Sequence, residues 1–206
     1  MLIKLYEENP AQKHINTIVE CLRDGGVIIY PTDTVYTFGC DIHQHKAVEK
    51  IARLKNMDPK KNELSIVCSN LSSLSEYTRP ISNATFKMMK RCLPGPFTFI
   101  LEANNKVPKI FHRKKKTVGI RIPNNSIVWS IVDELGNPIL STSLHSKDKI
   151  LDYSSDAELI HEEYKDKVDI VIDGGFGGNI PSTIVNCTKD EIEILREGLG
   201  DIALIY

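Results

Sequence analysis

The stretch 11–34, AQKHINTIVECLRDGGVIIYPTDT, holds a helical pattern followed by a strand pattern and predicts the class of fold. Apolar residues recur at helical spacing through 11–23, which are therefore expected to form an amphipathic helix. Gly25 and Gly26 are expected to end this helix, because glycine readily adopts the left-handed cap conformation. The apolar run 27–30 is then expected to be a buried strand with a polar loop at its carboxyl end.

Helical and strand patterns alternate along the rest of the chain. Further helices are expected at 46–54, 82–92, 127–135 and 155–164, and further strands at 65–68, 97–102, 118–122, 139–143, 168–172, 183–186 and 191–196. Ser82 is expected to cap its helix with Phe86 facing inward, and Ser155 is expected to form a capping box with Glu158. Without a linker or repeat, this order predicts a single α/β domain over 11–200, with a twisted mixed sheet and flanking helices.

Composition and charge limit the classes of protein that remain. The 206 residues are 41% hydrophobic and 26% charged, an ordinary globular composition that excludes a disordered or fibrous chain. The formal net charge is -1 and the sequence pI is about 6.6, so a site for nucleic acid or nucleotide must come from local clustering of cations. Residues 112–116 form such a cluster, with Lys106 and Lys109 just before it. The cluster is either a solvated loop or a phosphate-binding surface.

Cysteine usage and the pattern of apolar residues indicate a cellular compartment. The five cysteines are scattered and include no CxxC pair, so they fit neither a disulfide framework nor a zinc ribbon. The first ten residues lack a signal-peptide pattern. The longest apolar runs are about five residues, whereas roughly 20 are needed to span a bilayer. We therefore expect a cytoplasmic protein with reduced thiols and no membrane association.

Polar residues at three strand ends are the candidates for a ligand site, because ligands of open α/β sheets tend to bind beyond these ends. They are the loop 32–34, Arg121 and the segment 141–143. Each has an ordinary explanation as well, since loop hydroxyls can bond to their own backbone, an arginine can form a structural ion pair, and small polar residues can pack in a strand. If the three converge, hydroxyls beside a guanidinium suit a ligand with a carboxylate or phosphate.

Signatures of several common enzyme classes are missing from the sequence. It contains no GxxxxGK[ST] phosphate loop, no HExxH metal motif and no GxSxG nucleophile motif. The glycine-rich segment 174–178 does not fit the dinucleotide-binding pattern and is expected to be a flexible turn or lid. His43 and His45 are expected to be surface residues.

Six short motifs, taken in order, resemble those of the YrdC/YciO-like family, which includes the threonylcarbamoyl-AMP synthases. They are Tyr30–Tyr36 with Gly39, Leu93–Thr98, Val118–Pro123, Ser141–Ser143, Pro181–Val185 and Leu195–Gly198. Each motif is weak alone, but the ordered set covers nearly the whole chain. The resemblance is closest to the YciO branch of the family.

The resemblance implies a twisted α/β fold with a concave, positively charged face, and a nucleotidyltransferase activity. In the family reaction, L-threonine, bicarbonate and ATP, with Mg²⁺ on the triphosphate, give threonylcarbamoyl-adenylate and pyrophosphate. The product supplies the t6A modification of adenosine 37 in tRNA, and family members have also been linked to double-stranded RNA. By matching motif, substrate-binding residues would be Thr32, Thr34, Tyr36, Arg121 and Ser182, and nucleotide-binding residues would be Lys55, Ser143, His145 and Arg196.

Two nucleotide-side positions differ from the pattern of the synthases. Met57 stands where they typically have arginine, and His145 stands where they typically have asparagine. Methionine cannot form an ion pair with phosphate, and losing one such contact raises the activation free energy by about 2 to 4 kcal/mol. The leading hypothesis is a synthase of reduced efficiency. The alternatives are a non-catalytic module that binds double-stranded RNA or tRNA through 112–116, and an α/β domain that binds another small molecule.

Overall fold

The computed structural model describes residues 1–57, 64–107, 117–144, 155–189 and 191–206. The strands are β1 (Leu2–Lys4), β2 (Ile28–Tyr30), β3 (Thr37–Asp41), β4 (Ser65–Val67), β5 (Phe97–Glu102), β6 (Thr117–Arg121), β7 (Ile139–Ser143), β8 (Ile170–Asp173), β9 (Thr183–Asn186) and β10 (Glu193–Arg196). The α-helices are α1 (Gln12–Arg23), α2 (His45–Leu54), α3 (Leu74–Tyr77), α4 (Asn83–Cys92), α5 (Ser126–Leu135) and α6 (Ala157–Tyr164). Short 3₁₀ helices are η1 (Leu71–Ser73) and η3 (Ile202–Leu204).

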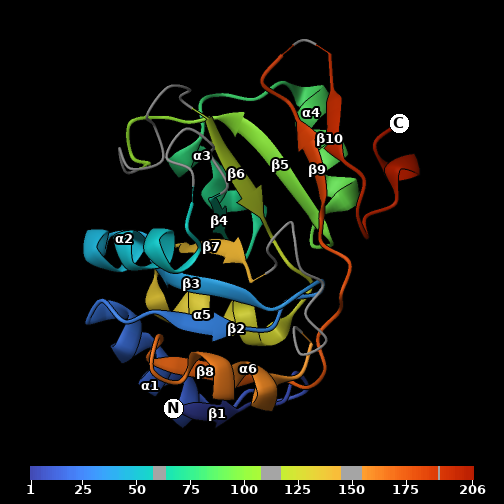
Figure 1. Ribbon diagram of the computed structural model, residues 1–206. Helices are drawn as coiled ribbons and strands as arrows, with labels where there is room; N and C mark the ends of the chain where they lie inside the picture. Colours follow the sequence, from blue (N-terminus) through green and yellow to red (C-terminus); the bar gives the residue numbers. More distant parts are fainter. Residues whose placement is uncertain (58–63, 108–116, 145–154, 190) are drawn as a thin grey trace.

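All ten strands belong to one sheet, in the order β1-β8-β2-β3-β7-β4-β6-β5-β9-β10. The sheet is mixed: β2 with β8 and β4 with β6 are parallel pairs, whereas β2 with β3 and β5 with β6 are antiparallel pairs. In Figure 1 the sheet is strongly twisted: β5 and β6 run steeply in the upper half of the view, whereas β2 and β8 run nearly horizontally in the lower half. The predicted single-domain α/β fold with a mixed, twisted sheet is confirmed.

The sheet separates two apolar clusters, because successive side chains of a strand point to opposite faces. Ile28 and Tyr30 of β2 pack in one cluster with α1 and α5, whereas Ile29 packs in the other with α2 and α4. The helices α1 and α5 pack against each other and lie behind the lower strands in Figure 1. The sheet is thus covered on both faces there, and this holds the polar loop after β2 on a rigid support.

One row of the sheet consists of small residues. Gly39, Ser141, Ser65 and Gly119 pair in register across β3, β7, β4 and β6. The ring of Tyr30 lies over this row, since a Cβ on Gly39 would be 2.6 Å from its Cε1 atom. The Tyr30 hydroxyl donates to Ser141 Oγ at 3.0 Å. The row therefore leaves room for side chains and loop residues to fold over the sheet beside the strand ends.

Most predicted helices and strands are confirmed within one or two residues, and the exceptions have local causes. The N-cap of α6 is Asp156 instead of Ser155, and its carboxylate accepts from the Glu158 and Leu159 N–H groups. Phe86 is 41% exposed instead of buried, because the buried face of α4 consists of Met88, Met89 and Cys92. Ser82 does cap α4, as predicted. The strands β1 and β3 and the helix α3 were not predicted.

Some predictions lie outside the described residues. These are the basic cluster 112–116, Lys109 and His145. Within the described ranges, no helix is both long and apolar enough to cross a membrane. The same ranges hold no group of three His, Cys, Asp or Glu side chains arranged to bind a metal ion.

Candidate functional site

The polar loop after β2 is organised by a directed chain of hydroxyl hydrogen bonds. Thr32 Oγ1 donates to the Val35 carbonyl at 2.8 Å and accepts from the Thr34 N–H at 3.2 Å. Its proton is thereby used, so Thr34 Oγ1 is the donor in the 3.0 Å contact between the two hydroxyls. The interpretation of Thr32 as a turn residue is confirmed. Thr34, in contrast, keeps its acceptor lone pairs for a partner outside the loop.

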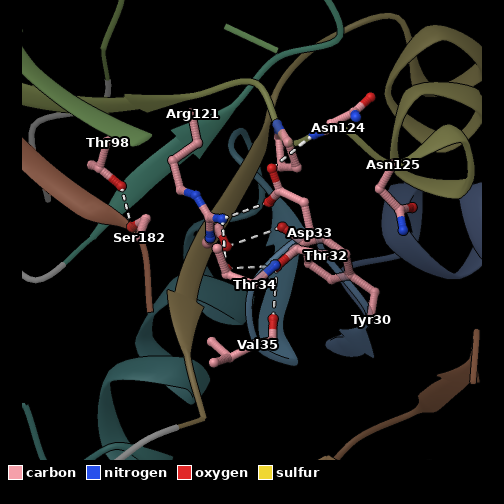
Figure 2. A network of polar contacts seen from close by, with 12 residues as sticks. Tyr30, Thr32, Asp33, Thr34, Val35, Thr98, Arg121, Asn124, Asn125 and Ser182 are labelled. Carbon is pink, nitrogen blue, oxygen red and sulfur yellow. Dashed lines mark hydrogen bonds and ion pairs between the residues drawn. The ribbon is translucent and has the colours of Figure 1, made fainter. Parts of the chain in front are cut away.

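That partner is Arg121, at the end of β6. Its Nη2 atom donates to Thr34 Oγ1 at 2.9 Å and lies 3.2 Å from Asp33 Oδ1. Asp33 Oδ2 in turn accepts from the Asn124 N–H at 2.9 Å. In Figure 2 the guanidinium of Arg121 is directed toward the loop, between Asp33 and Thr34. Arg121 therefore makes an ion pair, and the partner belongs to the candidate site itself.

The ion pair of Arg121 and Asp33 is removed from water. The side chains are 6% and 10% exposed. Burial raises the pKa of Asp33 above its ordinary value, and the Arg121 charge and the Asn124 N–H only partly offset this effect. Arg121 Nε is also buried and has no hydrogen-bond partner among the described residues. A buried donor without an acceptor costs about 1–3 kcal/mol, and an acceptor atom supplied by a ligand would remove this cost.

A second polar cluster lies beside Arg121 and is centred on Ser182. The Ser182 carbonyl accepts from Nε and Nη2 of Arg196 at 3.0 and 2.8 Å. The Ser182 hydroxyl accepts from Arg196 Nη2 at 3.3 Å and is 2.8 Å from Thr98 Oγ1. Phe99 of β5 pairs with Ile120 of β6, so the neighbouring residues Thr98 and Arg121 lie opposite each other on the two strands, as Figure 2 shows. The cluster therefore connects β10, β9, β5 and β6 at one end of the sheet.

The two arginines influence each other electrostatically. Burial, and then the positive charge of Arg121, lowers the pKa of Arg196 from its ordinary value. Arg121 is buried and Arg196 is exposed, and an anion bound between or beside the two guanidinium groups would relieve their repulsion. Arginine also presents a planar fork of donors that matches carboxylate and phosphate groups. The arrangement is suited to a ligand with more than one anionic group.

The glycine-rich turn after β8 is attached to the loop after β2. The fully buried Tyr36 donates its hydroxyl proton to the Gly175 carbonyl at 2.6 Å and accepts from the Gly174 N–H at 3.2 Å. Gly175 has a positive φ of 92°, which favours glycine. A Cβ on Gly178 would lie 2.2 Å from the Thr34 carbonyl oxygen. The turn can therefore pack tightly over Thr34 only because it is made of glycine.

The remaining predicted site residues lie at neighbouring chain segments. Ser143 ends β7 in register with Thr37, and the next N–H, of Leu144, donates to the Tyr36 carbonyl at 3.2 Å. This contact brings Ser143 next to the loop. Lys55 directly follows α2, where Asn56 takes a left-handed conformation with φ of 47°. Met57 comes next and packs against the larger core cluster.

The structure brings together Thr32, Thr34 and Arg121 in one contact group and Ser182 and Arg196 in another. Sequence reasoning assigned no role to Asp33 beyond a turn residue and none to Thr98. A signal for Asp33 existed, since it is the one carboxylate between two hydroxyls expected to face an arginine. Thr98 lies within the predicted motif Leu93–Thr98, but only the strand register shows that it meets Ser182.

Comparisons with known proteins identify the family of the chain. Residues 20–198 match the Sua5/YciO/YrdC family model, described as telomere recombination. The chain is 39% identical over 199 residues to the uncharacterised protein YciO of Escherichia coli K12, covering 96% of this chain and 95% of that protein. It is 29% identical over 184 residues to the threonylcarbamoyl-AMP synthase of Coxiella burnetii, covering 88% of this chain and 96% of that protein.

Solved structures give the same assignment. The crystal structure of E. coli YciO matches with a TM-score of 0.93 and 38% identity, covering 100% of this chain and 99% of that one. The crystal structure of P. abyssi Sua5 complexed with L-threonine matches with a TM-score of 0.87 and 26% identity, covering 96% of this chain and 57% of that one. The chain belongs to the Sua5/YciO/YrdC family, and within it the chain is related more closely to YciO than to the threonylcarbamoyl-AMP synthases.

Proposed function

We propose that this protein binds L-threonine and ATP and, with bicarbonate, forms threonylcarbamoyl-adenylate and pyrophosphate. The observation that carries the proposal is the buried Arg121, which is fixed by Thr34 and Asp33 and retains a buried Nε donor without a partner among the described residues. The relationship to threonylcarbamoyl-AMP synthases and to a Sua5 complexed with L-threonine supports the choice of ligand. The product would serve t6A modification of tRNA in the cytoplasm, and 11–200 would be the functional unit.

On the threonine side, each proposed residue has a distinct part. Arg121 would bind the substrate carboxylate with its guanidinium, which the loop holds in place through Nη2. Thr34 Oγ1 would offer its remaining lone pair to the substrate hydroxyl or amine, Thr32 would line the pocket and hold the Thr34 hydroxyl in place, and Ser182 would add a hydrogen bond from the other side. Tyr36 would support the pocket indirectly, because its hydroxyl is hydrogen-bonded to the glycine-rich turn that packs against Thr34.

On the nucleotide side, positively charged side chains would bind the phosphates of ATP. Arg196, Lys55 and Ser143 would contact the phosphates, with His145 next along the chain. The described residues hold no acidic cluster to bind a metal, so Mg²⁺ would come with the triphosphate as part of the substrate. Phosphate–guanidinium contacts are bidentate and charge-assisted, which makes them the strongest hydrogen bonds available to this site.

The chemistry asks the protein for positioning and charge neutralisation and does not need a protein nucleophile. The threonine amine and bicarbonate first form a carbamate with loss of water; a carbamate oxygen then attacks the α-phosphorus of ATP, so that a new P–O bond forms and pyrophosphate leaves. Arg196 and Lys55 would stabilise the negative charge on the transferring phosphoryl group, and Arg121 would align the carbamate. Met57 offers no charge at a position where the synthases have arginine. The reaction is therefore expected to be slower than in those enzymes.

The test is the release of pyrophosphate from ATP, measured with and without L-threonine and bicarbonate. The proposal predicts release that requires both, and that falls to the background level in the Arg121→Gln variant. L-valine is the control substrate, because it keeps the shape of threonine and lacks its hydroxyl. Release that does not depend on threonine in pure, folded protein would contradict the proposal.

A further inference from the structure

Asp33 differs from its neighbours in the loop because it contacts two other parts of the molecule at once. Its Oδ1 atom lies 3.2 Å from Arg121 Nη2, and its Oδ2 atom accepts from the Asn124 N–H at 2.9 Å. Asn124 directly precedes Asn125, which caps α5 by accepting from the Val128 N–H. The carboxylate thus links the guanidinium to the start of a ten-residue helix.

From this geometry we infer that Asp33 is a positioning residue, which holds the guanidinium of Arg121 in the orientation needed to receive a ligand carboxylate. The inference rests on the proposed function for the identity of the ligand. Two atoms contact its Nη2 atom, Thr34 Oγ1 and Asp33 Oδ1, and two contacts fix the plane of a guanidinium where one would allow rotation. Without the carboxylate, the guanidinium would be free to rotate about its remaining contact with Thr34 and would lose the orientation that a ligand needs.

A purely structural role for the ion pair is disfavoured by its energetics. Burial raises the pKa of Asp33 even though Arg121 is in contact with it, so the charge is held at a net cost to the folded state. Replacing a buried ion pair by neutral groups is often neutral for stability, whereas pre-organisation of a binding group appears as affinity. Burial raises the pKa of the nearby Glu7, and the negative charge of Asp33 adds to this rise.

The experiment is calorimetric titration of Asp33→Asn with L-threonine and with L-threoninamide, which lacks the carboxylate. The asparagine oxygen can still accept from the Asn124 N–H, so the loop keeps its anchor. Affinity for L-threonine should fall about tenfold or more, while affinity for L-threoninamide should change less than about twofold. Asp41→Asn is the matched control: Asp41 is 6% exposed, accepts from the His43 N–H and Asn137 Nδ2, and belongs to β3 away from Arg121.

A second measurement needs no ligand and separates this inference from the proposed function. The Arg121 Nε–H resonance, assigned by comparison with Arg121→Lys, should show slow solvent exchange in the wild type and faster exchange in Asp33→Asn. Unchanged exchange, or equal losses of affinity for both ligands, would overturn the inference. Absence of threonine binding in the wild type would reject the proposed function and leave the exchange measurement decisive. If Asp33→Asn fails to fold, Asp33→Glu keeps the charge and must show the same selective loss for L-threonine, to a smaller degree, or the inference fails.

Discussion

Arg121 Nη2 donates to Thr34 Oγ1 at 2.9 Å, although 87 positions of the chain separate the two residues. The contact joins the end of β6 to the loop after β2, across the intervening strands β3, β7 and β4. The small residues in register beneath, such as Gly39 and Ser141, allow the loop to fold back over the sheet. Together with the contacts of Asp33 to Arg121 and Asn124, the contact between Arg121 and Thr34 fixes the position of the loop relative to the end of β6.

Thr34→Val should weaken L-threonine binding. Valine keeps the shape of threonine but removes the oxygen that accepts from Arg121 Nη2, which leaves a buried donor with one partner fewer. We expect a loss of about 1–3 kcal/mol in binding, measured by calorimetry. Thr78→Val is the matched control, because Thr78 is 5% exposed and its hydroxyl donates to the Leu74 carbonyl, far from Arg121 in the sheet. Equal effects of both variants would contradict a specific role for Thr34.

Arg196→Gln should weaken ATP binding and leave L-threonine binding nearly unchanged. Arg196 is held by the carbonyl and hydroxyl of Ser182, and its removal takes away a charged phosphate partner worth about 1.5–3 kcal/mol. Fluorescence titration with a labelled ATP analogue would measure this loss. Arg79→Gln is the control, since Arg79 is an exposed arginine paired with Glu102 at the end of β5. A comparable loss in Arg79→Gln would show that net charge alone governs ATP affinity.

Met57→Arg should increase threonine-dependent pyrophosphate release. The new guanidinium would stand two positions after Lys55, where the synthases typically have arginine, and would add a charge to the phosphate site. We expect a gain of about tenfold, corresponding to roughly 1.4 kcal/mol. Met57 packs against the core, so thermal unfolding must be measured in parallel. Met57→Leu is the control for packing, and a folded Met57→Arg protein without any gain would contradict the assigned position.

Gly178→Ala should weaken L-threonine binding, although it adds a single methyl group. The added Cβ would lie 2.2 Å from the Thr34 carbonyl oxygen, so the turn or the loop must move. Overpacking of this kind costs about 1–3 kcal/mol, and part of it should appear as lost threonine affinity. Gly136→Ala is the control: Gly136 has φ of 81° at the end of α5 with open space around its Cα, so it strains the backbone without approaching the site. Only Gly178→Ala should affect binding.

The stability of the protein should decrease between about pH 10 and pH 12 because of Tyr36. Burial raises the pKa of Tyr36 to about 12, against about 10 in an unfolded chain. The folded state therefore holds this proton more tightly, so the contribution is fully present below pH 10 and is lost as the pH rises through 12. Urea unfolding at several pH values should show a smaller decrease, by on the order of 2 kcal/mol, in Tyr36→Phe. Tyr206→Phe is the control because that ring is 85% exposed, and an equal slope in Tyr36→Phe and the wild type would contradict the assignment.

Sequence reasoning predicted most of the fold because periodic apolar residues and turn residues decide local structure. The strand Ile139–Ser143 and the helix over 127–135 were found in this way. The strand β3 was missed because its sequence, TFGCD, follows a polar loop and contains a glycine. That glycine serves tertiary packing against Tyr30, which no local pattern reveals. Similarly, Asp156 and Ser155 are both good capping residues, and only the backbone decides between them.

The site was predictable in its residue types but not in its contacts. Thr34 and Arg121 could be chosen because polar residues at strand ends point to ligands, and the resemblance to a family selected the same positions. That Asp33 would neutralise Arg121 while its Nε atom remained unpartnered within the described ranges depends on how the loop folds over the sheet. The sequence separation between them makes such a contact invisible to any local pattern. The cluster of Thr98, Ser182 and Arg196 likewise follows from the order of β5, β9 and β10.

The decisive measurement is calorimetric titration with L-threonine of two proteins, the wild type and Arg121→Lys. Each protein is titrated without and with a non-hydrolysable ATP analogue. If the carboxylate of threonine is received by a guanidinium that Thr34 and Asp33 hold in place, the wild type binds one equivalent and the lysine variant, which keeps the charge but loses the planar group, binds at least about tenfold more weakly. Equal affinities in the two proteins, or no heat of binding in a folded wild type, would contradict the account.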